Sequence, residues 1–173
     1  MNRRMILLAA AAAATASPAL AQTASQSQVG EAEKTHAEKT AAIGGASLQM
    51  ANIAMQKATH PKVRVFAKFE HDEQTTVAAV LKSMDPSLNP PAPPPDVAQA
   101  LDKLKKMRAG TAFDREFISA QTKGHELLRT IQEDYLKAGH DLPTVNTTEL
   151  VLGMIDEHLT LLSDLDRDHL ASL

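Results

Sequence analysis

Apolar residues recur at helical spacing between residues 63 and 84, and the same face carries acidic side chains in its middle. The apolar stripe consists of Val63, Phe66, Val77, Leu81 and Met84. At about 100° per residue, Glu70 falls at the centre of this face, with Glu73 and Gln74 one turn further on its flanks. A helix that buries this face takes carboxylates inside with it. Such carboxylates need a cation, a metal, a hydrogen-bond partner or a proton, because an unpaired buried charge costs several kcal/mol.

Helical patterns also cover most of the remaining chain, and no stretch alternates like a strand. We predict helices over residues 31–58, a short one from Asp96 to before Gly110, one from Thr111 to before Gly139, and one from Asn146 onward. Asp96 is the expected cap of the short helix, and Thr111-x-x-Asp114 and Asn146-x-x-Glu149 resemble capping boxes. The first helix buries Ile43, Ser47, Met50 and Ala54; the 111–138 helix carries Phe117, Ile118, His125, Leu128 and Ile131; the last carries Val151, Met154, His158, Leu161 and Leu165.

The connections between these helices predict an all-α fold, an up-down four-helix bundle with an extra short helix between the second and third main helices. Thr59 is the expected cap before Pro61, so the corner at 59–61 is short, as is the one at 139–146. The segment 86–95, PSLNPPAPPP, runs from Pro86 to Pro95 and is read as a stiff spacer across one end of the bundle. Such a segment is also one that an envelope protein partner could bind.

Three polar residues of these buried faces lie at the same depth in the predicted bundle. Their depth is counted in residues from the two corners, which we expect at the same end. At about 1.5 Å per residue, Glu73, His125 and His158 all lie roughly 17 to 20 Å along their helices. On the first helix the same depth falls at residues 47–49, which offer only neutral groups. The sequence therefore predicts one central layer of carboxylates and histidines.

The first 21 residues have the pattern of a secretory signal peptide. Arg3 and Arg4 precede an apolar run, and Ala19-Leu20-Ala21 supplies a small-x-small ending. Residues 22–30 are polar and read as a flexible leader, and residues 31–173 as the bundle domain. Removal of 21 of the 173 residues leaves 152, enough for one domain, with no apolar run of transmembrane length. We therefore expect a soluble, exported protein of the periplasm.

Composition removes several function classes. The exported chain has 16 basic and 21 acidic residues, a net charge of −5, which argues against nucleic-acid binding. Cysteine is absent, so disulfides, thiolate metal sites and cysteine nucleophiles are excluded. No phosphate-binding loop and no H-E-x-x-H motif is present. Composition does not indicate the oligomeric state.

Three motifs resemble those of the domain-of-unknown-function family 4142, a family of bacterial envelope proteins. They are VRVFAKFEHDEQTTVAAVLKSM, AGTAFDREFISAQTKGHELL and MIDEHLTLL, within a similarity over about residues 42–165. The resemblance implies a ferritin-like four-helix bundle in the bacterial envelope and supplies no established reaction. Many members carry an Asp-His pair where this chain has Glu73 and Gln74, whereas His125 and His158 match histidines of the family.

The candidate site is the set Glu70, Glu73, His125 and His158. A di-iron bundle site needs Glu-x-x-His on two helices, but Thr122 and Ile155 stand three residues before the two histidines.

Two interpretations remain for this set. The residues hydrogen-bond to one another and fix the helix register, which we favour, or they hold a single Zn²⁺, Fe or Mn ion. The corresponding functions are a binding or structural module and, alternatively, a metal-dependent oxidase or peroxide-protection protein. No catalytic residue is assigned.

Two further pairs, Glu33-x-x-His36 and Asp166-x-x-His169, have metal-ligand spacing at the two ends of the predicted bundle chain. We expect these ends to meet and to be solvated.

Overall fold

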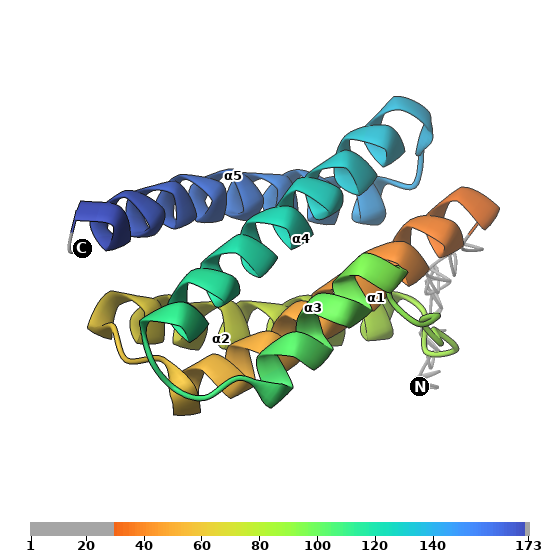
Figure 1. The fold of residues 1–173 in the computed structure, drawn as a ribbon. Helices are drawn as coiled ribbons and strands as arrows, with labels where there is room; N and C mark the ends of the chain where they lie inside the picture. The colour runs from red at the N-terminus through yellow and green to blue at the C-terminus, as the bar shows by residue number, and fades with distance from the viewer. Residues whose placement is uncertain (1–29, 172–173) are drawn as a thin grey trace, which may run out of the picture.

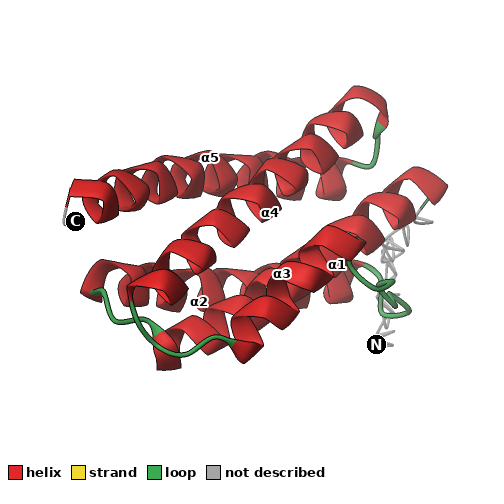
Figure 2. Cartoon of the chain, viewed as in Figure 1, coloured by secondary structure: helices red, strands yellow, loops and turns green. Residues whose placement is uncertain are grey.

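The computed structural model describes residues 30–171, with side chains to residue 168. The predicted signal peptide, nearly all of the leader and the last two residues lie outside this range. Five helices make up the described part, which contains no strand (Figure 2). They are α1 (Glu31–Lys57), α2 (Pro61–Met84), α3 (Pro95–Lys106), α4 (Thr111–Ala138) and α5 (Leu142–Ala171). Among these helices none has the length and apolarity that a membrane span requires.

The helices pair as two hairpins, α1 with α2 and α4 with α5 (Figure 1). The hairpins meet mainly where α1 packs on α4, and α3 lies along α1. By contrast, α2 meets α5 only sparsely. The described part of the chain is therefore all-helical, with its main core between α1, α2, α3 and α4 and further apolar contacts to α5.

The two corners lie at opposite ends of the molecule, so our expectation that they share one end is wrong. At the α1–α2 corner, the backbone N–H groups of Thr59 and His60 donate to the Asp114 carboxylate at the start of α4 (3.0 and 2.9 Å). At the other end, the Tyr135 hydroxyl donates to Glu33 at the start of α1 (2.9 Å). Consequently α2 and α4 run in the same direction, because α3 carries the chain back along the molecule between them (Figure 1).

The Asp114 side chain accepts hydrogen bonds from the neighbouring α1–α2 corner and does not cap its own helix. Its carboxylate is fully buried and also accepts the Thr59 hydroxyl proton (2.6 Å). Thr59 therefore does not cap α2, whose N-cap is His60, and the predicted capping box at Thr111 does not form, since α4 begins at Thr111 after Gly110. A carboxylate that accepts from two backbone N–H groups and a hydroxyl ties the start of α4 to the α1–α2 corner.

Two other helix starts also differ from the prediction. α5 begins at Leu142, four residues before Asn146, because the Asp141 carboxylate accepts the Thr144 N–H (3.1 Å) and hydroxyl (2.7 Å). α3 begins at Pro95 and has no side-chain cap, so Asp96 lies in its first turn. Proline suits a first helical turn because the N–H that it lacks would have no partner there.

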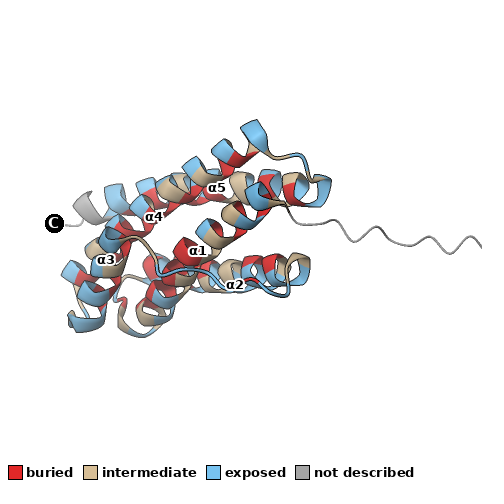
Figure 3. Ribbon diagram, turned by 90° about the vertical axis from the view of Figure 1, so that its right-hand side faces the viewer, coloured by how far each residue is buried: buried red, intermediate tan, exposed pale blue. Residues whose placement is uncertain are grey.

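The predicted buried face of α2 is confirmed. Val63, Phe66, Val77 and Leu81 are buried, and Glu70 between them is fully enclosed. Figure 3 shows buried, half-buried and exposed residues following one another along the helices. On α5, His158 and Leu165 are buried as predicted, but Leu161 is 39% exposed and Leu162 is buried in its place. Leu88 in the proline-rich segment packs on Val77 and Leu81, which anchors that segment to the domain.

Candidate functional site

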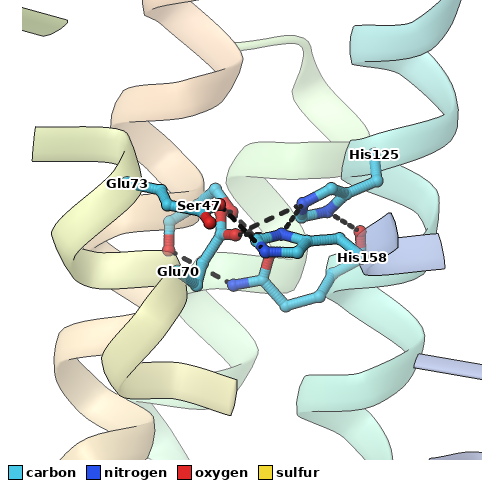
Figure 4. Close-up of polar contacts among 6 residues, drawn as sticks. Ser47, Glu70, Glu73, His125 and His158 are labelled. Atoms are coloured by element: carbon cyan, nitrogen blue, oxygen red, sulfur yellow. Dashed lines mark hydrogen bonds and ion pairs between the residues drawn. The ribbon is translucent and has the colours of Figure 1, made fainter. Parts of the chain in front are cut away.

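One polar layer crosses the middle of the helical domain, as the sequence predicts. It contains Ser47 from α1, Glu70 and Glu73 from α2, Gln121 and His125 from α4, and His158 from α5 (Figure 4). We call these six residues the central polar layer. The depth prediction holds although the corners lie at opposite ends, because Glu73, His125 and His158 each stand near the midpoint of a long helix.

Three atoms from three helices form a small triangle at the centre of this layer. Glu70 Oε2 lies 2.9 Å from His158 Nδ1 and 3.3 Å from His125 Nε2. The two ring nitrogens are 3.0 Å apart. All three side chains are buried, with exposed fractions of 0 to 5%. The structure thus brings together three of the four predicted ligands through one atom each.

The outward-facing ring nitrogen of each histidine meets an acceptor. His125 Nδ1 donates to the backbone carbonyl of Gln121 (2.8 Å), and His158 Nε2 donates to Glu73 Oε2 (2.9 Å). A carbonyl oxygen can only accept, so His125 carries its proton on Nδ1 and, when neutral, turns the Nε2 lone pair toward the triangle. Glu73, the fourth predicted ligand, is half-buried and contacts His158 from outside the triangle.

The two oxygens of Glu70 have different surroundings. Ser47 donates its hydroxyl proton to Oε1 at 2.5 Å, and Gln121 Nε2 donates to the Ser47 carbonyl at 3.3 Å. Oε2, in contrast, has no hydrogen-bond partner among the residues that the structure describes, because neither nearby ring nitrogen is aligned for one. Both rings contact this oxygen as ion-pair partners, but a buried carboxylate oxygen without a hydrogen bond is still costly and needs an explanation.

The charges within the layer depend on one another. Burial raises the pKa of the Glu70 carboxyl, but His125, His158 and the Ser47 hydroxyl outweigh burial and hold that pKa well below its ordinary range. Burial lowers the pKa of His158, but the Glu70 and Glu73 carboxylates raise it to about 9. Without a bound ion, the layer at neutral pH therefore contains a Glu70 carboxylate beside a protonated His158.

A second buried polar cluster lies toward the start of α1, where we expected solvated groups. Glu33 and His36 are 9% and 4% exposed, and Tyr135 stacks on His36 with ring centroids 4.4 Å apart. His36 Nε2 lies 2.7 Å from Gln132 Oε1, to which it donates. The expectation that this end is solvated and meets the end of α5 is wrong, because the end of α4 covers it. Asp166 is exposed at the opposite end of the molecule, and the side chain of His169 lies outside the described residues.

Sequence reasoning missed Gln121 and the second polar cluster. Gln121 stands four residues before His125, on the same helical face, and Gln132 stands seven residues after it. A polar residue at that spacing on an otherwise apolar face is the signal that could have identified both residues.

Comparison with known proteins gives a family without an assigned role. The family model described as Domain of unknown function (DUF4142) matches residues 12–165. No curated protein and no solved structure matches the chain.

Proposed function

This chain belongs to the DUF4142 family, whose description assigns no role, and from the geometry of the central polar layer we propose that it binds one divalent metal ion. The ligands are Glu70, His125 and His158, and the ion is Zn²⁺, Fe²⁺ or Mn²⁺. The observation that carries the proposal is the convergence of three ligand atoms from three helices on one buried point.

The size of the triangle suits a metal. Ligands about 2.0 to 2.1 Å from a tetrahedral ion lie roughly 3.3 Å from one another. The three ligand atoms are 2.9 to 3.3 Å apart, so an ion needs them to separate by only a few tenths of an ångström. Glu70 Oε2, which has no hydrogen-bond partner in the described part of the chain, gains one bond to the ion.

The outer contacts also match those of metal-binding histidines. Such histidines donate their second ring N–H to a carboxylate or a backbone carbonyl, which fixes the ring and its tautomer. His158 has the first arrangement with Glu73, and His125 has the second with Gln121. In this proposal Glu73 orients a ligand and is not itself one.

The ligand set favours one ion and leaves its identity open. Two imidazoles and one carboxylate are found on zinc and on non-haem iron. A second ion would need further carboxylates at the layer, but Thr122 and Ile155 occupy the helical positions that would supply them. No reaction is assigned to the site.

The rival interpretation is that the layer serves register alone. The 3.0 Å contact between the two ring nitrogens and the raised pKa of His158 favour it, because a shared proton can replace the ion at the centre. The two interpretations predict different metal contents for the purified protein.

Metal analysis of the exported protein after gel filtration tests the proposal. We expect one ion per chain in the wild type and in His71→Ala, which removes a histidine outside the layer. Glu70→Gln and His158→Ala should lose the ion. Glu73→Gln should keep the fold and bind the metal about 10- to 100-fold more weakly. A wild type with no bound ion, or an unchanged His158→Ala, would refute the proposal.

We further propose that the four long helices form a ferritin-like bundle and that the protein works in the periplasm. One long crossover between parallel helices, as α3 supplies here, is a feature of ferritin-like folds. The location rests on the signal-peptide pattern of residues 1–21. N-terminal sequencing of the exported protein should begin at Gln22, and an intact Met1 on exported protein would refute the cleavage.

A further inference from the structure

We propose that the bound ion keeps one coordination position open, that this position takes water or a ligand of two or three atoms, and that such a ligand enters between α1 and α2 past Gln74. This inference rests on the proposed metal site. It adds the class of exogenous ligand and the route by which it arrives.

A cavity next to the two histidines supports the open position. Its volume is about 10 Å³, near the minimum for one water molecule, and His125, His158 and Glu73 line it. Three protein ligands leave a tetrahedral ion with one position for water or substrate. The cavity is therefore in reach of that position. It has room for water as it stands, and a linear ligand of two or three atoms also needs the space that Gln74 leaves when it moves, which excludes bulky ligands.

Two other sides of the triangle are filled. Ser47 lies against Glu70, and the Phe66 ring packs edge-on to His158 with centroids 5.0 Å apart. Phe66 is 3% exposed and closes the layer toward the groove that it lines between α2 and α5. An exogenous ligand thus has no open path from either of these directions.

A larger groove lies on the far side of Gln74. Its volume is about 350 Å³, it runs between α1 and α2, and it opens to solvent. Thr40, Gln74 and Val77 line both the groove and the inner cavity, so these three side chains form the wall between them. This wall separates the solvent-filled groove from the cavity that the two histidines line.

Gln74 is the movable part of that wall. Val77 is buried and the Thr40 hydroxyl accepts a hydrogen bond from Gln132, whereas the Gln74 amide has no hydrogen-bond partner within the described residues. Gly44 leaves room for the Gln74 side chain, because a Cβ at position 44 would overlap Gln74 Oε1. A flexible side chain without a partner can swing aside at low cost.

The Co²⁺-loaded protein tests the inference, because the visible spectrum of Co²⁺ responds to its coordination. We expect azide to change the spectrum saturably and imidazole, whose ring exceeds the cavity, to leave it unchanged. In stopped-flow measurements, Gln74→Ala should raise the azide association rate constant at least about threefold. Gln56→Ala, an exposed glutamine on α1, should match the wild type.

Each contrary result has a separate meaning. Co²⁺ binding without any azide response overturns the open position and leaves the metal site intact. An imidazole response equal to that of azide overturns the small-ligand class. Equal association rates in the wild type and Gln74→Ala overturn the route. A wild type that fails to bind Co²⁺ overturns the proposed metal site and this inference with it.

Discussion

Replacing His158 with alanine in the metal-free protein should destabilise it by about 3 kcal/mol at pH 7. A histidine pKa raised from 6.5 to about 9 corresponds to roughly 3 kcal/mol of favourable interaction with the carboxylates beside it, since one pKa unit is worth about 1.4 kcal/mol. Removal of the ring leaves Glu70, which is fully buried, without its cation. Breaking a buried pair on one side typically costs about 3 to 5 kcal/mol.

The double-mutant cycle with Glu70→Gln separates this charge effect from the lost packing of the ring. The neutral amide of Gln at position 70 needs no cation beside it. In the His158→Ala background, Glu70→Gln should therefore recover at least about 1 kcal/mol of the lost stability. Urea unfolding with a chelator present measures all four proteins, and His71→Ala serves as the control, because His71 is half-buried and lies outside the layer. A coupling energy near zero would refute the claim that the central polar layer behaves as one unit.

Three further outcomes follow from the structure. The free energy of unfolding of the metal-free protein should be greatest between about pH 4.5 and 6.5. The stabilisation from protonated His158 is complete below pH 6.5 and is lost as the pH rises toward 9. The stabilisation from the Glu70 carboxylate is complete above pH 4.5 and is lost as the pH falls. Urea midpoints across this range test it, and an unchanged midpoint between pH 6.5 and 9 would contradict it. Val77→Asp should cost at least about 2 kcal/mol more than Asp72→Ala, because Val77 is buried and Asp72 is exposed; equal urea midpoints would show that the buried face is misassigned. Asp114→Ala should lower the free energy of unfolding by about 3 kcal/mol in the same assay without changing metal content, since it removes the acceptor for two backbone N–H groups far from the layer; a loss of metal would contradict that separation.

The face of α2 and the central polar layer could be predicted because periodicity depends only on local spacing. Glu70 lies at the centre of an apolar stripe, and a residue near the midpoint of a long helix has the same depth whichever end is counted from. Helix direction was not predictable in this way. It depends on α3, which carries the chain back along the molecule, and a helical pattern contains no information about where its helix lies.

The sequence also could not predict the details that distinguish a metal-binding layer from one that only fixes the helix register. Whether Glu70 or Glu73 supplies the carboxylate corner of the triangle depends on the side-chain rotamers and on how α2 is rotated about its axis against the neighbouring helices. Asp114 caps the α1–α2 corner from a different helix, so local capping rules assigned it to the wrong backbone groups. The burial of Glu33 and His36 depends on the end of α4, which lies about 100 residues further along the chain.

X-ray absorption at the zinc edge of the Zn²⁺-loaded protein reports whether Glu70, His125 and His158 hold the ion. We expect a first shell of nitrogen and oxygen at about 2.0 to 2.1 Å. We also expect outer-shell scattering from two imidazole rings in the wild type and from one ring in His125→Ala. An ion whose spectrum shows no imidazole scattering, or one that stays fully bound with unchanged scattering when His125 is replaced, would contradict it.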